Sequence, residues 1–361
     1  DMALLEYATR TVPDVVKKSV LSFYNRDPLL SRLQSRNQVK RSGGTNVRVV
    51  RVKSGHSDVT QIDASNISVP LNKKETLSSM SGDWAKYIKP IILPHIDRDR
   101  QSNKEDVKRF IQDMTNAAMQ SLKNDVVRQL YIGNITTLSG LGTLNGNTTG
   151  LSSTGFENGA LRFQTPADQA SATIAYLGET RVNDTTDFVD NWFNQYAVHT
   201  GFGTDFMQTA EEIKITADTY AEDEEGISLG VVSISDHVAL GEELRAYPGG
   251  ATAGAIVYTV DDLEKGRAHP TVHVANGVQY FANRWMTDAA IDSGGTFQNH
   301  AYFLNPNAIE YWVNANNDFR VTKFSDHLET SNTDADIAYI LLEIQFAVPN
   351  LMANGCTSDT V

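Results

Sequence analysis

A three-and-four spacing of apolar residues runs through residues 102–131 and predicts one long amphipathic helix, with one face buried and the other in water. Ser102 and Glu105 have the spacing of a capping box, in which each side chain satisfies a backbone N–H of the first turn. At about 1.5 Å per residue this helix would be about 45 Å long, so a long flat surface is expected to lie against it. The apolar positions are Val107, Phe110, Ile111, Met114, Ala117, Ala118, Leu122, Val126 and Leu130, and the polar positions between them are Lys104, Lys108, Arg109, Asp113, Lys123 and Asp125.

Runs of β-forming residues on both sides of this helix predict three strands, over 45–52, 84–93 and 337–348. The first two enclose the polar stretch 53–83, which is too long for an ordinary connection and predicts either a flexible loop or an extended two-stranded arm. Such an arm has no core of its own and needs a neighbour to lie on. The third strand is expected to pair far back in the sequence, near the long helix.

The middle of the chain reads as a compact α+β domain. Residues 133–159 are dense in Gly, Thr, Asn and Ser and are typical of a loop or a domain junction. The following patterns predict a helix over 204–220, a buried strand over 226–235 and a helix over 236–247 capped by Asp236. Residues 271–281 predict a β-hairpin, because Asn276-Gly277 suits a type I′ turn between β-rich flanks.

The composition is that of a folded protein, with 40% hydrophobic and 21% charged residues over 361 positions. The longest apolar run, over 339–348, is broken by Glu343 and Gln345 and is far short of a membrane span, and no signal-peptide core is seen. Cys356 is the only cysteine, which excludes an intrachain disulfide and a cysteine metal cluster and fits a reducing cytoplasm.

The net charge of −13 is unevenly distributed. Residues 1–53 contain eleven Lys/Arg against four Asp/Glu, a net of +7, which leaves −20 for the rest of the chain. An acidic body repels nucleic acid, while the basic end can touch nucleic acid or the acidic surface of a sister subunit. The sequence therefore does not indicate a specific nucleic-acid binder.

Candidate chemistry is sparse. His95, Asp97 and Asp99 alternate and would share one face of a strand, as a divalent metal requires, but Asp is also favoured ahead of a helix for the dipole alone. His269 and His273 are four apart, yet Pro270 denies them a helix. The chain has no nucleophile elbow, phosphate loop or dinucleotide fingerprint. No catalytic residue, metal site or cofactor is predicted.

The order of these parts resembles the major capsid protein of tailed bacteriophages, the Hong Kong 97-type fold that is also seen in encapsulin shells. The resemblance covers most of the chain in order, although each motif is short. The segments that carry it are 27–33 (Asp-Pro-Leu-Leu-Ser-Arg-Leu), Val39, 42–45 (Ser-Gly-Gly-Thr), 84–87 (Trp-Ala-Lys-Tyr), the helix over 102–131, 301–306, 332–336, 344–350 and Asn354-Gly355.

The resemblance implies an α+β, Hong Kong 97-type subunit with no active site. It implies an N-terminal arm over 1–44, an extended loop over 45–92 that lies on a neighbouring subunit, a peripheral domain over 93–135 and 325–361 built on the long spine helix, and an axial domain over 136–324. It also implies self-assembly into pentamers and hexamers of an icosahedral head that encloses double-stranded DNA, held by non-specific contact. The expected location is the virion, assembled in the host cytoplasm.

Further expected partners are scaffolding, portal and cement proteins, with no membrane. Some members of the family crosslink through a Lys and an Asn, but no partner for such a lysine can be matched here. Two alternatives stay open: an encapsulin-like compartment that holds an enzyme, and a metal-dependent hydrolase with His95, Asp97 and Asp99 as ligands. The candidates for contact between subunits are Arg41, Arg48, Arg51, Lys73, Lys74, Trp84 and Lys86.

Overall fold

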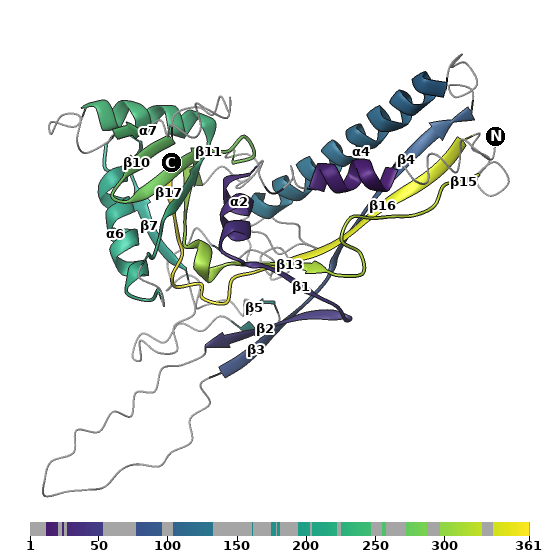
Figure 1. The fold of residues 1–361 in the computed structure, drawn as a ribbon. Helices are drawn as coiled ribbons and strands as arrows, with labels where there is room; N and C mark the ends of the chain where they lie inside the picture. Colours follow the sequence, from purple (N-terminus) through teal and green to yellow (C-terminus); the bar gives the residue numbers. More distant parts are fainter. Residues whose placement is uncertain are drawn as a thin grey trace, which may run out of the picture. The chain divides into compact units, whose positions relative to one another are not determined.

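The computed structural model describes two compact units, and each draws on segments that are far apart in the sequence (Figure 1). The first unit comprises residues 1–47, 83–130 and 311–346, and the second comprises 48–82, 131–310 and 347–361. Within these limits the described residues are 12–20, 24, 27–52, 77–95, 104–132, 161, 175–177, 179–180, 194–202, 204–221, 225–246, 255–257, 272–286, 297–326 and 335–360.

A six-stranded sheet is the centre of the first unit, and its longest strand is β16 (Ala335–Ala347). β16 pairs antiparallel with β4 (Ala85–Pro94) over ten residue pairs, from Ala335 opposite Pro94 to Ile344 opposite Ala85. This confirms the prediction that the late strand pairs far back in the sequence, just ahead of the long helix. The other strands are β1 (Val39–Ser42), β13 (Glu310–Asn314), β14 (Arg320–Val321) and β15 (Ser325–Asp326).

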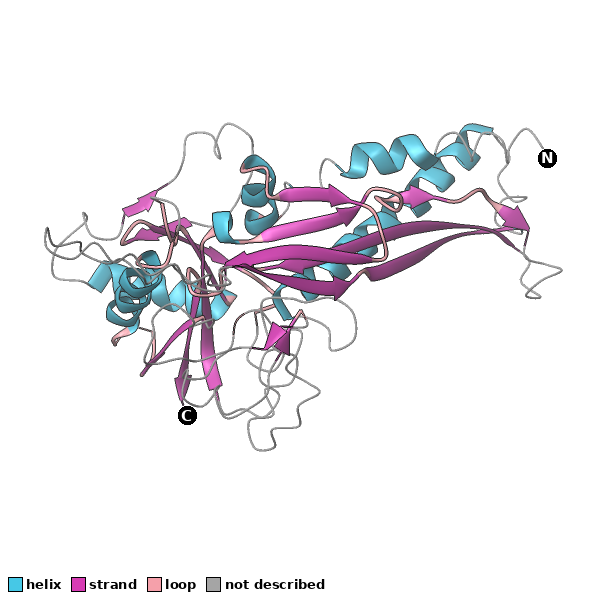
Figure 2. Cartoon of the chain, turned by 90° about the horizontal axis from the view of Figure 1, so that it is seen from below, coloured by secondary structure: helices cyan, strands magenta, loops and turns pink. Residues whose placement is uncertain are grey.

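The predicted long helix is α4 (Lys104–Ile132), which has 29 residues and runs along this sheet (Figures 1 and 2). The hydroxyl of Tyr87 on β4 donates a hydrogen bond to Oε1 of Gln129 on α4 and ties the helix to one face of the sheet. The predicted cap residue Ser102 and the side chains of Glu105 and Val107 lie outside what the structure describes. The buried side chains of α4 in this unit are Ile111, Thr115, Ala118, Met119, Leu122, Lys123, Val126 and Leu130.

Two positions of the predicted helix pattern are wrong. Ala117 is exposed, and Lys123, which was expected in water, is buried. The Nζ of Lys123 donates to the backbone oxygen of Ser19 at 2.6 Å and to Ser19 Oγ at 2.9 Å. Ser19 lies in the last turn of a helix over residues 12–20, where carbonyl groups lack intrahelical partners and a cation is favoured. The lysine is therefore buried because it holds the N-terminal helix on α4.

The segment 27–33 forms the start of α2 (Pro28–Ser35), as the proline at the first helical position predicts. One carboxylate oxygen of Asp27 accepts hydrogen bonds from the backbone N–H groups of Leu29 at 3.0 Å and Leu30 at 3.2 Å. Leu29, Leu30 and Leu33 are all fully buried, so the cap fixes a short helix whose leucines belong to the core.

The second unit contains a seven-stranded sheet in the order β7-β17-β12-β8-β11-β10-β9. Its core is built by Phe206, Ile213, Val232, Tyr280, Phe303 and their neighbours. The described residues also form two short ribbons, β2–β3 and β5–β6. The bounds are β2 (Asn46–Val52), β3 (Leu77–Asp83), β5 (Ala175–Tyr176), β6 (Glu179–Thr180), β7 (Gln195–His199), α6 (Phe206–Asp218), β8 (Leu229–Val232), α7 (Ile234–Ala246), β9 (Ala255–Val257), β10 (Val272–Ala275), β11 (Val278–Ala282), β12 (Phe297–Leu304), the 3₁₀ helix η1 (Pro306–Ala308) and β17 (Gly355–Thr360).

The hairpin prediction is confirmed by β10 and β11, which pair antiparallel. Asn276 (φ 52°) and Gly277 (φ 76°) both have the left-handed backbone of a type I′ turn. The predicted cap of α7 is wrong. Ser233 Oγ accepts a hydrogen bond from the backbone N–H of Asp236 at 3.1 Å, so the helix begins two residues earlier and Asp236 lies in its first turn.

β17 pairs with β12 and β7 in the second unit, although the sequence-based division places residues 325–361 in the peripheral domain. The division into four parts stays a prediction.

His237 of α7 stacks on His273 of β10, with ring centroids 4.2 Å apart, and both side chains are buried. Burial and the neighbouring His273 ring lower the pKa of His237 to about 4, while a backbone hydrogen bond at Tyr280 acts in the opposite sense. The helix packs closely against this pair at Gly241. A Cβ added there would lie 2.9 Å from Nε2 of His273, which is too close for a side chain without movement of the imidazole ring.

This pair predicts acid sensitivity of the second unit. The unfolded chain takes up a proton near pH 6.5, above the pKa of about 4 in the folded state, so the free energy of unfolding falls as the pH drops between these values, by about 2–3 kcal/mol at most. Urea unfolding at a series of pH values measures this slope. His237→Gln, which does not titrate, should show a smaller fall, and an unchanged slope in that variant contradicts the prediction.

Candidate inter-subunit surface

The face of β4 that points away from α4 carries exposed apolar side chains. Along β4 the residues alternate, and Lys86, Ile88, Pro90 and Ile92 share one face and are all exposed. Ile88 is 62% exposed and Ile92 is 39% exposed. The alternate residues, which include Tyr87, face α4. The face of β4 that points away from α4 therefore carries apolar side chains, as the face toward α4 does.

The paired strand β16 extends this surface. Residues directly opposite in an antiparallel pair point to the same face, and the register places Leu341 opposite Ile88 and Tyr339 opposite Pro90, both of which are partly exposed. Ile337, opposite Ile92, is buried. An antiparallel sheet with one solvated face normally carries polar side chains there. A contiguous apolar patch marks a surface that another protein covers. We refer to Ile88, Pro90, Ile92, Tyr339 and Leu341 as the outer sheet face.

A polar cluster borders this face at the Ala85 end of β4. Glu343, which lies opposite Lys86, accepts a hydrogen bond from Nδ2 of Asn314 at 2.6 Å. Lys86 Nζ is 3.9 Å from the other carboxylate oxygen of Glu343, and its side chain is mostly exposed. An ion pair of this length at a mostly exposed lysine contributes little to stability, so the ammonium group of Lys86 is available to a neighbouring molecule.

The structure places the predicted contact residues in different environments. Arg41 is exposed and forms an ion pair with Asp318 at 3.0 Å, and Arg48 is exposed on β2. Trp84 and Arg51 are 6% and 1% exposed, and Trp84 Nε1 donates to the backbone oxygen of Gly44 at 3.0 Å. Burial leaves these two side chains little surface for a neighbour. Lys73 and Lys74 lie outside the described residues.

The apolar members of the outer sheet face were not among the residues predicted from the sequence. A signal was present, because residues 87–93 (Tyr-Ile-Lys-Pro-Ile-Ile-Leu) are apolar at almost every position rather than at alternate ones. Such a run predicts a strand that is covered on both faces. In the described part of the chain the face toward α4 is covered, while Ile88 and Ile92 on the other face of β4 are exposed.

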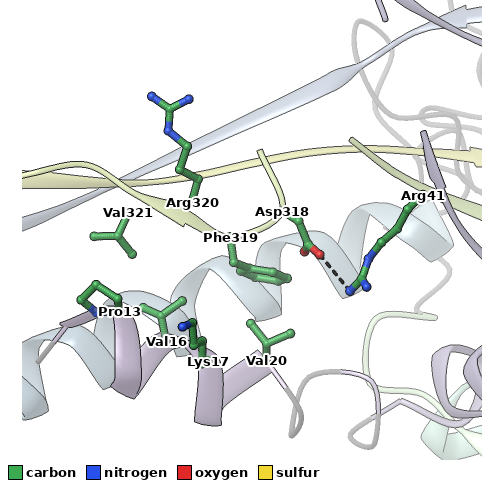
Figure 3. A pocket seen from close by; sticks show the side chains of 9 residues that line it. All are labelled: Pro13, Val16, Lys17, Val20, Arg41, Asp318, Phe319, Arg320 and Val321. Carbon is green, nitrogen blue, oxygen red and sulfur yellow. Dashed lines mark ion pairs between the residues drawn. The ribbon is translucent and has the colours of Figure 1, made fainter. Parts of the chain in front are cut away.

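An open pocket of about 400 Å³ also lies in the first unit, between the helix over 12–20 and the strip from Asp318 to Val321 (Figure 3). Val16 and Phe319 are buried at its base, while Lys17 and Arg41 are exposed beside it. Phe319 has a φ of 49°, a left-handed backbone that is rare for a bulky residue. The remaining lining residues are Pro13, Val20, Arg320 and Val321.

The candidate metal ligands are only partly described. His95 Nε2 lies 3.4 Å from a carboxylate oxygen of Asp336 on β16, while Asp97 and Asp99 fall outside the described residues. Among the residues whose placement is described, no group of three His, Cys, Asp or Glu side chains could hold a metal ion. None of the helices in that part of the chain is long and apolar enough to span a membrane.

The long helix along a sheet, together with a second unit that has its own sheet, defines a mixed helix-and-strand fold like that of phage capsid subunits. A chain of the cyanophage A-1(L) capsid asymmetric unit superposes with a TM-score of 0.56 at 11% identity, covering 90% of each chain. A capsid chain of a native GTA particle gives 0.53 at 11% identity over 91% of each chain. A chain from Mycobacterium phage Adephagia gives 0.50 at 11% identity, over 91% of this chain and 90% of that one. No family model and no curated protein sequence matches the chain.

Proposed function

We propose that this chain is the major capsid subunit of a tailed phage, with a Hong Kong 97-type fold, and that it assembles into pentamers and hexamers of an icosahedral head. The observation that carries the proposal is the fold shared with capsid chains over about nine-tenths of the length. Such a subunit functions by binding other copies of itself, and no catalytic role is proposed.

The outer sheet face supports this proposal on physical grounds. Its isoleucines are exposed on a folded unit, which is costly for a monomer and useful for a subunit whose apolar patch is covered on assembly. In this arrangement the extended loop of a neighbouring subunit, which includes Lys73 and Lys74, lies over the face. Lys86 at its end adds a cation that a neighbour can pair with.

The charge of the chain suits a container for double-stranded DNA. Residues 54–361 carry a net charge of −20, so the body of the subunit repels phosphates and does not add salt-dependent affinity along the duplex. The basic residues of 1–53 are left to make the few contacts with DNA or with acidic neighbours. The proposed place of the protein is the virion, with assembly in the host cytoplasm and with scaffolding, portal and cement proteins as further partners.

Electron microscopy of the expressed protein tests the proposal. Closed shells are expected, and shells filled in the presence of the packaging proteins should protect double-stranded DNA from nuclease. A shell that instead protects a cargo enzyme indicates an encapsulin-like compartment. A protein that stays monomeric under every assembly condition contradicts the proposed function.

A deletion of the extended loop provides the matched variant. Joining β2 to β3 by a short turn in place of residues 53–76 keeps both described strands. We expect this variant to melt cooperatively at the wild-type temperature, because the deleted stretch is poor in core-forming residues, and to form no shells. Loss of the cooperative transition contradicts a peripheral role for the loop.

A further inference from the structure

The pocket of the first unit combines an apolar base with cations at its rim. Pro13, Val16 and Val20 of the N-terminal helix face Phe319 and Val321 across it, as Figure 3 shows. The side chain of Arg320 leaves the strand on the opposite side. The left-handed backbone of Phe319 costs of order 1–3 kcal/mol, and such strain is concentrated at functional sites.

The rim can bind two carboxylates. Lys17 is exposed, and no described residue forms an ion pair with it. Arg41 pairs with Asp318 at 3.0 Å, but its guanidinium group is exposed and has five N–H donors, so it can accept a second carboxylate. The pocket therefore fits an aliphatic side chain that is flanked by acidic residues.

A convex surface with this chemistry is found on α6 in the second unit. Ile215 is 60% exposed, and Glu211 and Glu212, one turn earlier, lie on the same face of the helix. The single lysine of the helix, Lys214, is held by Asp218 at 2.6 Å. Glu212 accepts a long hydrogen bond from Gln208 at 3.4 Å, and no described cation pairs with either glutamate.

The sequence around this surface strengthens the match in charge. Residues 211–225 contain seven Asp/Glu against one Lys, while residues 1–53 have a net charge of +7. The opposite face of α6 is fully used, because Phe206, Ala210, Ile213 and Ala217 belong to the core of the second unit. Ile215 is not part of this core, and most of its side chain is exposed.

We infer that the pocket receives the α6 surface of a second copy of this chain, with Ile215 between Val20 and Phe319 and with Glu211 and Glu212 against Lys17 and Arg41. This inference rests on the proposed function. Two different surfaces of one chain make a heterologous contact, which repeats from copy to copy and closes into a ring when the rotation allows. One side chain seated in a pocket of about 400 Å³ buries far less surface than the roughly 800 Å² per partner of a stable interface, so this contact forms one part of the interface around a capsomer.

Cysteine crosslinking in assembled shells tests this contact directly. Cys356 is buried and is the only cysteine, so the wild-type protein should give no crosslinked product with a thiol-reactive reagent. Shells co-assembled from a Val20→Cys variant and an Ile215→Cys variant are treated with a short bismaleimide. We expect a crosslinked dimer in the mixture and in neither variant alone. A chain with both cysteines should give a ladder that ends at closed pentamers and hexamers.

Charge reversal gives an independent readout. Lys17→Glu places like charges together and should lower the shell yield by about tenfold or more, and adding Glu211→Lys should restore most of it. Lys18→Glu is the matched control, because Lys18 is exposed on the same helix but does not line the pocket, and its yield should stay close to wild type.

Shells that form normally without any crosslink in the mixture overturn the inference and leave the proposed function intact. An equal loss of yield in Lys17→Glu and Lys18→Glu, or a failure of Glu211→Lys to restore assembly, also overturns it. Absence of shells from the wild-type protein removes the proposed function and the inference together.

Discussion

Replacing Leu122 by Asp in α4 is expected to abolish the folded subunit. Leu122 is 3% exposed at the centre of the buried face of the helix. The substitution loses the burial of a leucine side chain and places a carboxylate where no cation has been positioned to receive it. These two costs together amount to about 5 kcal/mol or more, which is comparable with the whole stability of a typical domain. The expected result is insoluble protein, or a chain without a cooperative urea transition, and no shells.

The control for this variant is Gln120→Asp, which introduces the same side chain on the exposed face of α4 two residues earlier. Its unfolding free energy should stay within about 0.5 kcal/mol of wild type, and its shells should form. Lys108→Ala is also expected to be tolerated. Normal shells from Leu122→Asp would show that α4 buries another face.

The buried face of α4 could be predicted because helical periodicity is a local property of the sequence. Lys123 shows the limit of such reasoning. Its Nζ binds Ser19, which is 104 residues earlier in the chain, and no local pattern marks a lysine that fills the carbonyl end of a distant helix. The same limit applies to α7, where the choice between Ser233 and Asp236 as the cap depends on backbone geometry.

Strand pairing could be predicted only in part. The hairpin of β10 and β11 was readable because its turn chemistry is contained in two adjacent residues, Asn276 and Gly277. The pairing of β16 with β4 was expected only as a long-range pairing, and its register is set by the packed sheet. The assignment of β17 to the second sheet had little local signal, because only the two threonines of its six residues (Gly-Cys-Thr-Ser-Asp-Thr) favour strands, while Gly and Asp disfavour them.

The candidate surface was the hardest part to derive from the sequence. The selection of Arg41, Arg48, Arg51, Lys73, Lys74, Trp84 and Lys86 favoured charged residues and a tryptophan in the arm and the loop. The structure adds apolar residues of β4, whose exposure depends on which face α4 covers. It also separates Arg41, Arg48 and Lys86, which are exposed, from Arg51 and Trp84, which are not.

Replacing Ile88 and Ile92 together by Glu is expected to separate assembly from folding. Both side chains are exposed in the isolated subunit, so the melting temperature should change little. In a shell the exposed parts of both would be covered, and because Ile88 is 62% and Ile92 39% exposed this amounts to about one whole isoleucine side chain. The loss of about 1.5–3 kcal/mol of burial weakens every contact by roughly tenfold to a hundredfold. Size-exclusion chromatography and electron microscopy should find folded subunits or small oligomers in place of shells.

The conservative pair Ile88→Val and Ile92→Val retains a β-branched apolar surface and should assemble. The pair Asn116→Glu and Gln120→Glu adds the same two negative charges at exposed positions of α4. This pair should assemble as well if the loss in the double variant comes from the outer sheet face and not from added negative charge. Shells of normal yield and stability from the double Glu variant would show that this face stays in water in the particle. The contact between subunits would then depend on the pocket beside Lys17 and Arg41 instead of the outer sheet face. The charge-reversal variants test that pocket separately.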